Sequence, residues 1–282
     1  MKPRILIYFS LIAIAIVAGV AVSQSTPVTI GLYVPDKLNT ELVQSLAERL
    51  FPSHNVEIVS FYNLAEIENS PKLVLFIGSS YPTLIYSNAQ NGNVFLESNQ
   101  VETVSLIASR STKTKALEDL KGSIVGVGPV DDSLSFLLGV FALSPIVDDI
   151  RFVPDRMGIY SIPNSTSLKV LDRQDRRAQL SHNRISAAFF EEKEDSSYGR
   201  LIYQTSAPKL FITSTSNTEE NSRLKELLMA YEPTNPDPPP TTSMQRVEIQ
   251  DTLSKLGYSF TEPKEFTALQ NQYKKYKENL PY

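Results

Sequence analysis

The sequence predicts an α/β protein built around a mainly parallel sheet. Short apolar runs of strand length alternate with segments in which apolar residues recur at helical spacing. That alternation is typical of parallel strands joined by helices. The chain has 282 residues, which is enough for one large domain or for two lobes with separate cores.

The N-terminal segment has the pattern of an export signal. Lys2 and Arg4 carry positive charge ahead of an apolar run at residues 5–22, and the basic end of such a segment stays in the cytoplasm. The run is 18 residues long, whereas a cleaved leader has an apolar region of roughly 7–15 residues and a membrane-spanning helix needs about 20. Residues 1–23 are therefore either a signal peptide or a membrane anchor, and the rest is expected to be exported, periplasmic or extracellular.

The first elements after this segment alternate between strand and helix. Residues 28–34 form an apolar run that Pro35 and Asp36 end, which predicts a buried strand. Residues 39–51 have helical periodicity, and Asn39 is the expected N-cap because its side chain can accept from a free backbone N–H group. The same signals predict strands at residues 56–61 and 73–77, with a short helical turn at residues 64–69 between them.

The remaining strands and helices are predicted from the same apolar runs and helical periodicity. Further strands are predicted at residues 101–108, 124–127, 150–153, 185–190, 201–203 and 210–213. Helices are predicted at residues 116–120, 134–143, 167–180, 218–231, 245–256 and 265–277. The charged residues of 167–180, Arg176 among them, are expected on a solvated face. The proline-rich stretch at residues 233–240 is expected to be an exposed connector.

The composition excludes several classes of function. The net charge is −4 with no basic block, so a nucleic-acid surface is not predicted. Cysteine is absent, which removes disulfides, thiolate chemistry, zinc–thiolate sites and the lipobox of a lipoprotein. His54 and His182 lie among polar residues without a partner at ligand spacing, so both are expected to be exposed. No metal site and no cofactor are predicted.

An enzyme is not predicted either. The sequence has no Gly-x-Ser-x-Gly elbow, Walker loop, Gly-x-Gly-x-x-Gly or His-Glu-x-x-His motif. Glu191 and Glu192 are adjacent carboxylates, but neighbours on a strand point to opposite faces and do not form an acid–base pair. The α/β fold hosts some enzymes, so the fold alone does not decide this question.

Residues 111–127, which read STKTKALEDLKGSIVGV, carry a family resemblance. They resemble a segment of the type 2 periplasmic binding proteins, most of all the phosphonate- and phosphite-type substrate-binding proteins of ABC transporters. Residues 72–81, 184–188 and 206–208 fall in the order in which that family has its similar segments. The resemblance covers most of residues 27–280, and its most specific part is residues 117–127.

The resemblance implies two α/β lobes joined by two crossover strands, with a ligand closed between the lobes. Lobe one would hold residues 27–105 and 207–282, and lobe two residues 106–206. The chain departs from the family in the ligand loop of lobe two, where Asp131 and Asp132 stand and no glycine is present. Two carboxylates beside the expected anion position disfavour a phosphate-like ligand.

Two loops are candidates for lining the ligand cleft. Ser79, Ser80 and Tyr81 follow a predicted buried strand, and ligands in open parallel sheets bind beyond the carboxyl ends of strands. Ser133 and Ser135 open the predicted helix after residues 124–127, where free N–H groups and hydroxyls can hold an anion without a lysine. The alternative interpretation is that both loops are ordinary strand-to-helix turns with N-caps.

Two functions remain open. The first is an extracytoplasmic solute-binding protein that closes on a small polar or anionic ligand, phosphonate-like by resemblance, and delivers it to the permease of an ABC-type transporter. The second is a membrane-anchored protein of the same fold that no longer transports and instead senses a ligand or binds a partner protein. The long apolar leader, the missing lipobox and the altered ligand loop favour the second.

Overall fold

The computed structural model describes residues 27–130, 133–144, 153–154, 159–161, 166–191, 199–216, 218–229, 243–277 and 280. The predicted leader at residues 1–23, Asp131, Asp132 and the proline-rich stretch at residues 233–240 lie outside this set. Within the described ranges, no helix has the length and apolar character that a membrane span requires.

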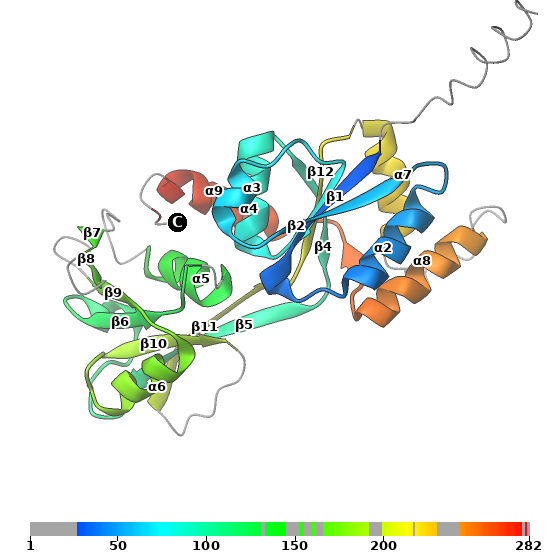
Figure 1. Cartoon of the computed structure of the whole chain (residues 1–282). Coiled ribbons are helices and arrows are strands. Elements are labelled where there is room, and N and C mark those ends of the chain that lie inside the picture. Colours follow the sequence, from blue (N-terminus) through cyan, green and yellow to red (C-terminus); the bar gives the residue numbers. More distant parts are fainter. Residues whose placement is uncertain are drawn as a thin grey trace, which may run out of the picture.

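Two mixed sheets form the framework (Figure 1). The first sheet has the strand order β13-β4-β12-β3-β1-β2, and the second has the order β11-β5-β10-β6-β9-β8-β7. The strands of the first sheet are β1 (Val28–Tyr33), β2 (Val56–Phe61), β3 (Leu75–Gly78), β4 (Asn93–Ser98), β12 (Phe211–Ser214) and β13 (Phe260–Thr261). Those of the second are β5 (Val101–Ser109), β6 (Ile124–Val127), β7 (Val153–Pro154), β8 (Ile159–Ser161), β9 (Ser167–Val170), β10 (Ala187–Glu191) and β11 (Gly199–Pro208).

Helices cover both faces of the first sheet, and together they make the first lobe. Because successive strand residues point to opposite faces, Leu75 and Ile77 pack with α2, α7 and α8, whereas Phe76 packs with α3, α4 and α9. The six helices are α2 (Thr40–Leu50), α3 (Leu64–Glu68), α4 (Ser80–Gln90), α7 (Thr218–Leu228), α8 (Ser243–Leu256) and α9 (Phe266–Tyr276). A short 3-10 turn, η1 (Val34–Asp36), follows β1.

The second sheet and its helices make the second lobe. The same alternation operates along β10, where Phe189 packs toward α5 and Phe190 packs toward α6. The helices here are α5 (Ser133–Leu143) and α6 (Arg173–Ser181), with a 3-10 turn, η2 (Leu117–Leu120), before β6.

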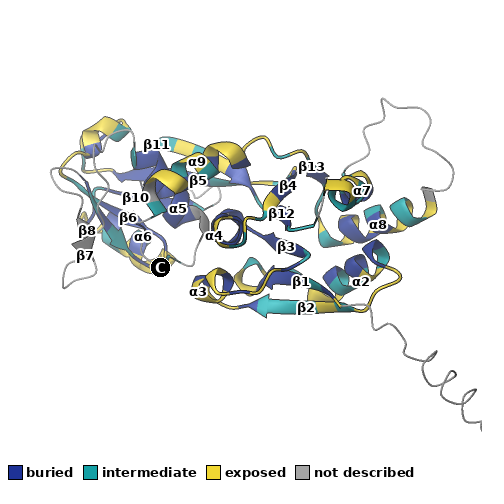
Figure 2. Cartoon of the chain, turned by 90° about the horizontal axis from the view of Figure 1, so that it is seen from above, coloured by how far each residue is buried: buried dark blue, intermediate teal, exposed yellow. Residues whose placement is uncertain are grey.

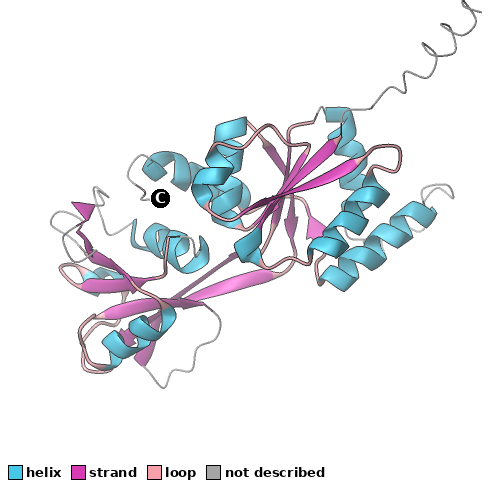
Figure 3. Cartoon of the chain, in the orientation of Figure 1, coloured by secondary structure: helices cyan, strands magenta, loops and turns pink. Residues whose placement is uncertain are grey.

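The strands β5 and β11 join the two lobes. They pair antiparallel along their length, with Ala108 opposite Arg200 and Glu102 opposite Ala207. One strand leaves the first sheet after β4 and the other returns to it before β12, so they form a two-stranded crossover (Figure 3). This agrees with the predicted pair of crossover strands. We propose that the lobe boundaries fall within them, near residues 105 and 207.

The predicted parallel sheet is mixed in the structure. β1 runs parallel to β2 and β3, and β6 runs parallel to β9 and β10. β12 is antiparallel to β3 and β4. β11 extends through Pro208, where the sequence predicted a link, because a terminal position on an edge strand tolerates a residue without an N–H donor.

One helix prediction was wrong and one helix was missed. Residues 167–180 are a strand and a helix, β9 and α6, because the Asp172 side chain accepts from Asp175 N and starts a new helix. The sequence also missed α4, whose first turn contains Ser80, Tyr81 and Pro82. Serine and tyrosine are modest helix formers, and proline is tolerated in a first turn because its missing N–H would have no intrahelical acceptor.

The prediction of a solvated charged face was wrong for Arg176. Its side chain is buried, its Nη1 donates to Phe189 O at 2.6 Å, and its guanidinium carbon lies 5.5 Å from the Phe190 ring centroid. A carbonyl acceptor and an aromatic face compensate part of the cost of burying this cation. Arg176 therefore fastens α6 to β10.

Candidate functional site

The start of α4 is buried between the two lobes (Figure 2). β3 ends at Gly78, Ser79 precedes the helix, and the Thr83 hydroxyl donates to Gly78 O at 3.0 Å across the first turn. Ser79 is 4 % exposed, and Ser80 and Tyr81 are fully buried. The three predicted residues thus lie at the carboxyl edge of the first sheet, as expected, but inside the molecule rather than on an open surface.

A carboxylate from the same chain occupies this helix start. Asp36 Oδ2 accepts from Ser79 N at 2.7 Å. Burial raises the pKa of Asp36 to about 6, hydrogen bonds from Ser79 oppose the rise, and the negative charge of Glu102 adds to it. The pKa of the Tyr258 hydroxyl is also raised, first by burial and then by Glu102 and Asp36. Lys209 Nζ lies 3.6 Å from Glu102 Oε1 and offsets part of this negative charge.

The start of α5 has a similar arrangement. Ser133 is the first residue of α5, and its side chain lies outside the described part of the structure. Ser135 is fully buried, and its backbone N–H donates to Glu191 Oε1 at 3.3 Å. Glu191 is the last residue of β10, so the carboxyl end of that strand faces the first turn of α5. Glu192 lies outside the described residues.

Aromatic rings connect the two helix starts. Tyr81 and Phe136 are stacked, with ring centroids 6.4 Å apart and an angle of 19° between the ring planes. Tyr81 also meets the edge of Tyr273 on α9, at 6.2 Å and 69°. Both distances lie in the range of favourable ring pairs. The structure therefore brings the predicted Tyr81 and Ser135 segments together, across a packed contact between the lobes.

The contact between the lobes contains a buried hydroxyl group without a partner among the described residues. The Ser80 hydroxyl is fully buried and has no hydrogen-bond partner among the described residues, which costs free energy unless a partner reaches it. In the described ranges no group of three or more His, Asp or Glu side chains could hold a metal ion. His54 and His182 are exposed, as predicted.

The sequence reasoning missed the two carboxylates at the helix starts. Asp36 lies 43 positions from Ser79, and Glu191 lies 56 positions from Ser135. A signal for Asp36 was present, because it follows β1 at the same carboxyl edge that directed attention to Ser79. For Glu191 the equivalent signal was the end of β10. Phe136 and Tyr273 gave no signal beyond ordinary apolar periodicity.

Comparisons with known proteins bear on the fold. No protein-family model and no curated protein matches the sequence. Solved structures do match: the Xanthomonas citri protein XAC2383 bound to ATP has a TM-score of 0.65 at 10% identity, over 91% of this chain and 100% of its own. This chain has the fold of the type 2 periplasmic binding proteins.

The descriptions of two further neighbours name a small molecule that each protein binds. PhnD1 from Prochlorococcus marinus, in complex with methylphosphonate, has a TM-score of 0.51 at 12% identity, over 90% of this chain and 100% of its own. The periplasmic aliphatic sulphonate binding protein SsuA from Escherichia coli has a TM-score of 0.50 at 17% identity, over 90% of this chain and 88% of its own. At these identities the likeness concerns the type 2 fold.

Proposed function

We propose that this chain is an exported solute-binding protein that holds a small polar molecule between its two lobes. The observation that carries the proposal is the meeting of the α4 and α5 starts across the β5–β11 crossover. In a fold of this kind a hinge opens and closes the lobes around a ligand. Of the neighbours described above, PhnD1 was solved in complex with methylphosphonate and SsuA is a sulphonate binding protein, which supports binding rather than catalysis.

We infer further that the solute is neutral or carries an ammonium group. Helix starts attract anions through their free N–H groups, but here Asp36 and Glu191 already accept from Ser79 N and Ser135 N. A phosphonate or sulphonate would meet like charge at both positions. An ammonium group would instead pair with these carboxylates, and a neutral polar group would reach the Ser80 hydroxyl.

The solute enters when the lobes separate. Ser79, Ser80, Tyr81 and Ser135 are buried in the contact between the lobes, so a ligand reaches them only from an open form. We propose that the closed, loaded form is recognised by an ABC-type permease at the membrane. Residues 1–23 would provide either export alone or a permanent anchor.

A second candidate is a protein of the same fold that senses or binds a partner without transport. The stacked Tyr81 and Phe136 rings favour it, because they hold the lobes together where a solute-binding protein needs space. In this case the surface of the closed form, and not the cleft, carries the function.

A thermal-shift screen of the full-length chain in mild detergent tests the first proposal. The panel contains amines, amino acids, sugars, methylphosphonate, alkanesulphonates and ATP. A ligand at 100 times its Kd adds about 2.7 kcal/mol to the unfolding free energy, which a melting curve resolves. We expect a shift with amines or amino acids that Ser80→Ala weakens and Ser222→Ala, an exposed change on α7, leaves intact.

Two other outcomes of the screen would each overturn a proposal. A shift with phosphonate or sulphonate alone overturns the inferred solute class. A flat screen overturns the solute-binding proposal and favours the partner-binding protein.

A further inference from the structure

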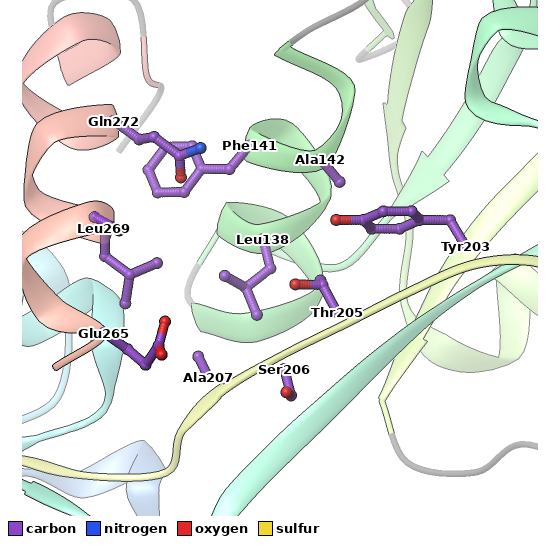
Figure 4. A pocket seen from close by; sticks show the side chains of 11 residues that line it. Leu138, Phe141, Ala142, Tyr203, Thr205, Ser206, Ala207, Glu265, Leu269 and Gln272 are labelled. Atoms are coloured by element: carbon purple, nitrogen blue, oxygen red, sulfur yellow. The ribbon is translucent and has the colours of Figure 1, made fainter.

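A pocket lies at the junction of the lobes, beside residues 138–142 of α5 rather than at the packed start of that helix. It has a volume of about 160 Å³ and lies between α5, β11 and α9 (Figure 4). Leu138 and Phe141 form one wall, Tyr203 and Thr205 come from the crossover strand, and Glu265 and Gln272 belong to the C-terminal helix segment. None of the residues at the α4 start lines it.

Each polar side chain that lines this pocket has an oxygen that can accept a hydrogen bond. The Glu265 carboxylate and the Thr205 hydroxyl point into the pocket in Figure 4, with the Tyr203 hydroxyl and the Gln272 amide at its rim. None of the described lining residues is Lys, Arg or His. Glu265 also makes no ion pair through its carboxylate with any described residue. The pocket therefore offers acceptors and one negative charge to a cation.

The apolar wall and the volume restrict the occupant. The side chains of Leu138 and Phe141 on α5 and of Leu269 on α9 give the pocket an apolar lining, so part of the ligand must be aliphatic. The volume of about 160 Å³ holds roughly five water molecules at about 30 Å³ each. It is below the roughly 300 Å³ at which drug-sized ligand pockets begin, so a nucleotide does not fit. A primary ammonium on a short alkyl chain matches the charge, the apolar wall and the size.

Because the pocket lies between the lobes, a ligand in it would stabilise one angle between them. α5 belongs to the second lobe, α9 packs on the first lobe, and β11 crosses between them. An occupant that touches all three elements binds only at one angle between the lobes. By linkage it stabilises that angle over the open form.

We propose that this pocket is a binding site for a small aliphatic ammonium compound, which stabilises the closed arrangement of the lobes. The Glu265 carboxylate accepts from the ammonium group, Thr205 and Gln272 complete its polar surroundings, and the alkyl chain packs on Leu138 and Phe141. The site is separate from the solute position between the α4 and α5 starts and stands whether or not that position binds a solute.

The test uses n-butylammonium chloride on the full-length chain in mild detergent, followed by titration calorimetry. Sodium butyrate and n-butanol are the matched probes, because they keep four carbons and change the charge and the hydrogen-bonding character of the head group. We expect binding of n-butylammonium, binding of n-butanol at least ~10-fold weaker, and no binding of butyrate, because hydrogen bonds to charged groups are the stronger kind. Equal binding of all three probes overturns the proposal.

Variants locate the site. Glu265→Gln keeps the side-chain shape and should weaken n-butylammonium binding by ~10-fold or more. Glu262→Gln, at an exposed glutamate three positions earlier that pairs with Lys225, should bind like the parent. Ala268→Leu fills the pocket from an exposed helical position and should abolish binding while the protein stays folded. Parent-like binding by Glu265→Gln or Ala268→Leu refutes the assignment to this pocket.

Solution scattering measures the effect on the lobes. We expect n-butylammonium to decrease the radius of gyration of the parent and of Glu262→Gln, and to leave that of Glu265→Gln unchanged. Binding without any change in the radius of gyration contradicts the proposed stabilisation of the closed form.

Discussion

The carboxyl group of Asp36 makes stability depend on pH. Its pKa rises from 3.8 to about 6, mainly through burial, so the folded state disfavours the ionised form. Above pH 6 the group is ionised in both states and destabilises the fold. As the pH falls through about 6, the Asp36 carboxyl is protonated in the folded state before it is protonated in the unfolded state. The destabilisation is therefore fully lost below the unfolded-state pKa of 3.8.

We therefore predict that Asp36→Asn stabilises the protein at neutral and higher pH. The amide oxygen can still accept from Ser79 N, while the partly buried charge is removed. At pH 8 the gain should be about 1–2 kcal/mol, because a change of one in pKa corresponds to about 1.4 kcal/mol and solvent screens a partly exposed carboxyl. The gain should vanish near pH 4. Urea unfolding at pH 4 and pH 8 measures both.

Asp119→Asn is the control with the opposite sign. Backbone N–H groups of Lys115 and Ala116 lower the pKa of Asp119, so its ionised form stabilises the fold above the unfolded pKa and that contribution is lost in acid. This variant should be less stable than the parent at pH 8. If both variants change stability in the same direction, the assignment of the Asp36 effect to its buried charge is wrong.

Helices and strands with strong periodicity were predictable from the sequence. Asn39 caps α2 as expected, with its side chain accepting from Leu42 N at 3.1 Å. This was predictable because the cap residue and the helical periodicity after it are both local signals. The start of α4 escaped prediction since its first turn, with Ser80 and Pro82, lacks local preference and the helix is stabilised by burial on all sides. In β9 a four-residue strand merged with the helix after it, because so short a segment has no period of its own.

At the scale of an element, the close approach of β5 and β11 depends on Gly199. A Cβ at this position would lie 2.2 Å from Ala108 O, which belongs to the backbone of the partner strand. Since a backbone atom cannot move aside like a side chain, we predict that Gly199→Ala costs about 1–3 kcal/mol, the range of overpacked sites. Urea unfolding measures the loss.

Ser206→Ala is the matched change on β11, because Ser206 is exposed on the same strand. It should leave the unfolding midpoint within about 0.5 kcal/mol of the parent, as is usual for exposed substitutions. A parent-like midpoint for Gly199→Ala would show that the two crossover strands lie farther apart than their pairing implies.

For the whole molecule, the site was predictable only in part. The rule that ligands bind at the carboxyl edge of parallel strands selected Ser80, and the free N–H groups of a helix start selected Ser135. The fold brings both to the contact between the lobes. The acceptors at those helix starts were not predicted, because Asp36 and Glu191 come from distant segments whose approach depends on both sheets. Long-range register decides such contacts, and a single sequence contains no local signal for it.

We expect the contact between the lobes to set the equilibrium between their closed and open arrangements. The stacked pair of Tyr81 and Phe136 joins α4 to α5, so separating the two helix starts would break it. Such a pair contributes about 0.5–1.5 kcal/mol beyond its buried area. Losing it lowers the ratio of closed to open molecules by roughly 2- to 10-fold. We therefore predict that Phe136→Leu shifts the protein toward the open form, which increases the radius of gyration in solution scattering. A ligand of the closed form should also bind this variant more weakly.

Phe189→Leu separates this effect from a general loss of stability. Phe189 is fully buried on β10 inside the second lobe, so its truncation weakens the core without removing the Tyr81 contact. Both variants should melt at lower temperature, but only Phe136→Leu should expand the native protein. Equal radii of gyration for Phe136→Leu and the parent would mean that the crossover strands, and not the ring pair, fix the angle between the lobes. In that case the closed form persists without a ligand and the fold serves a partner-binding role better than solute transport.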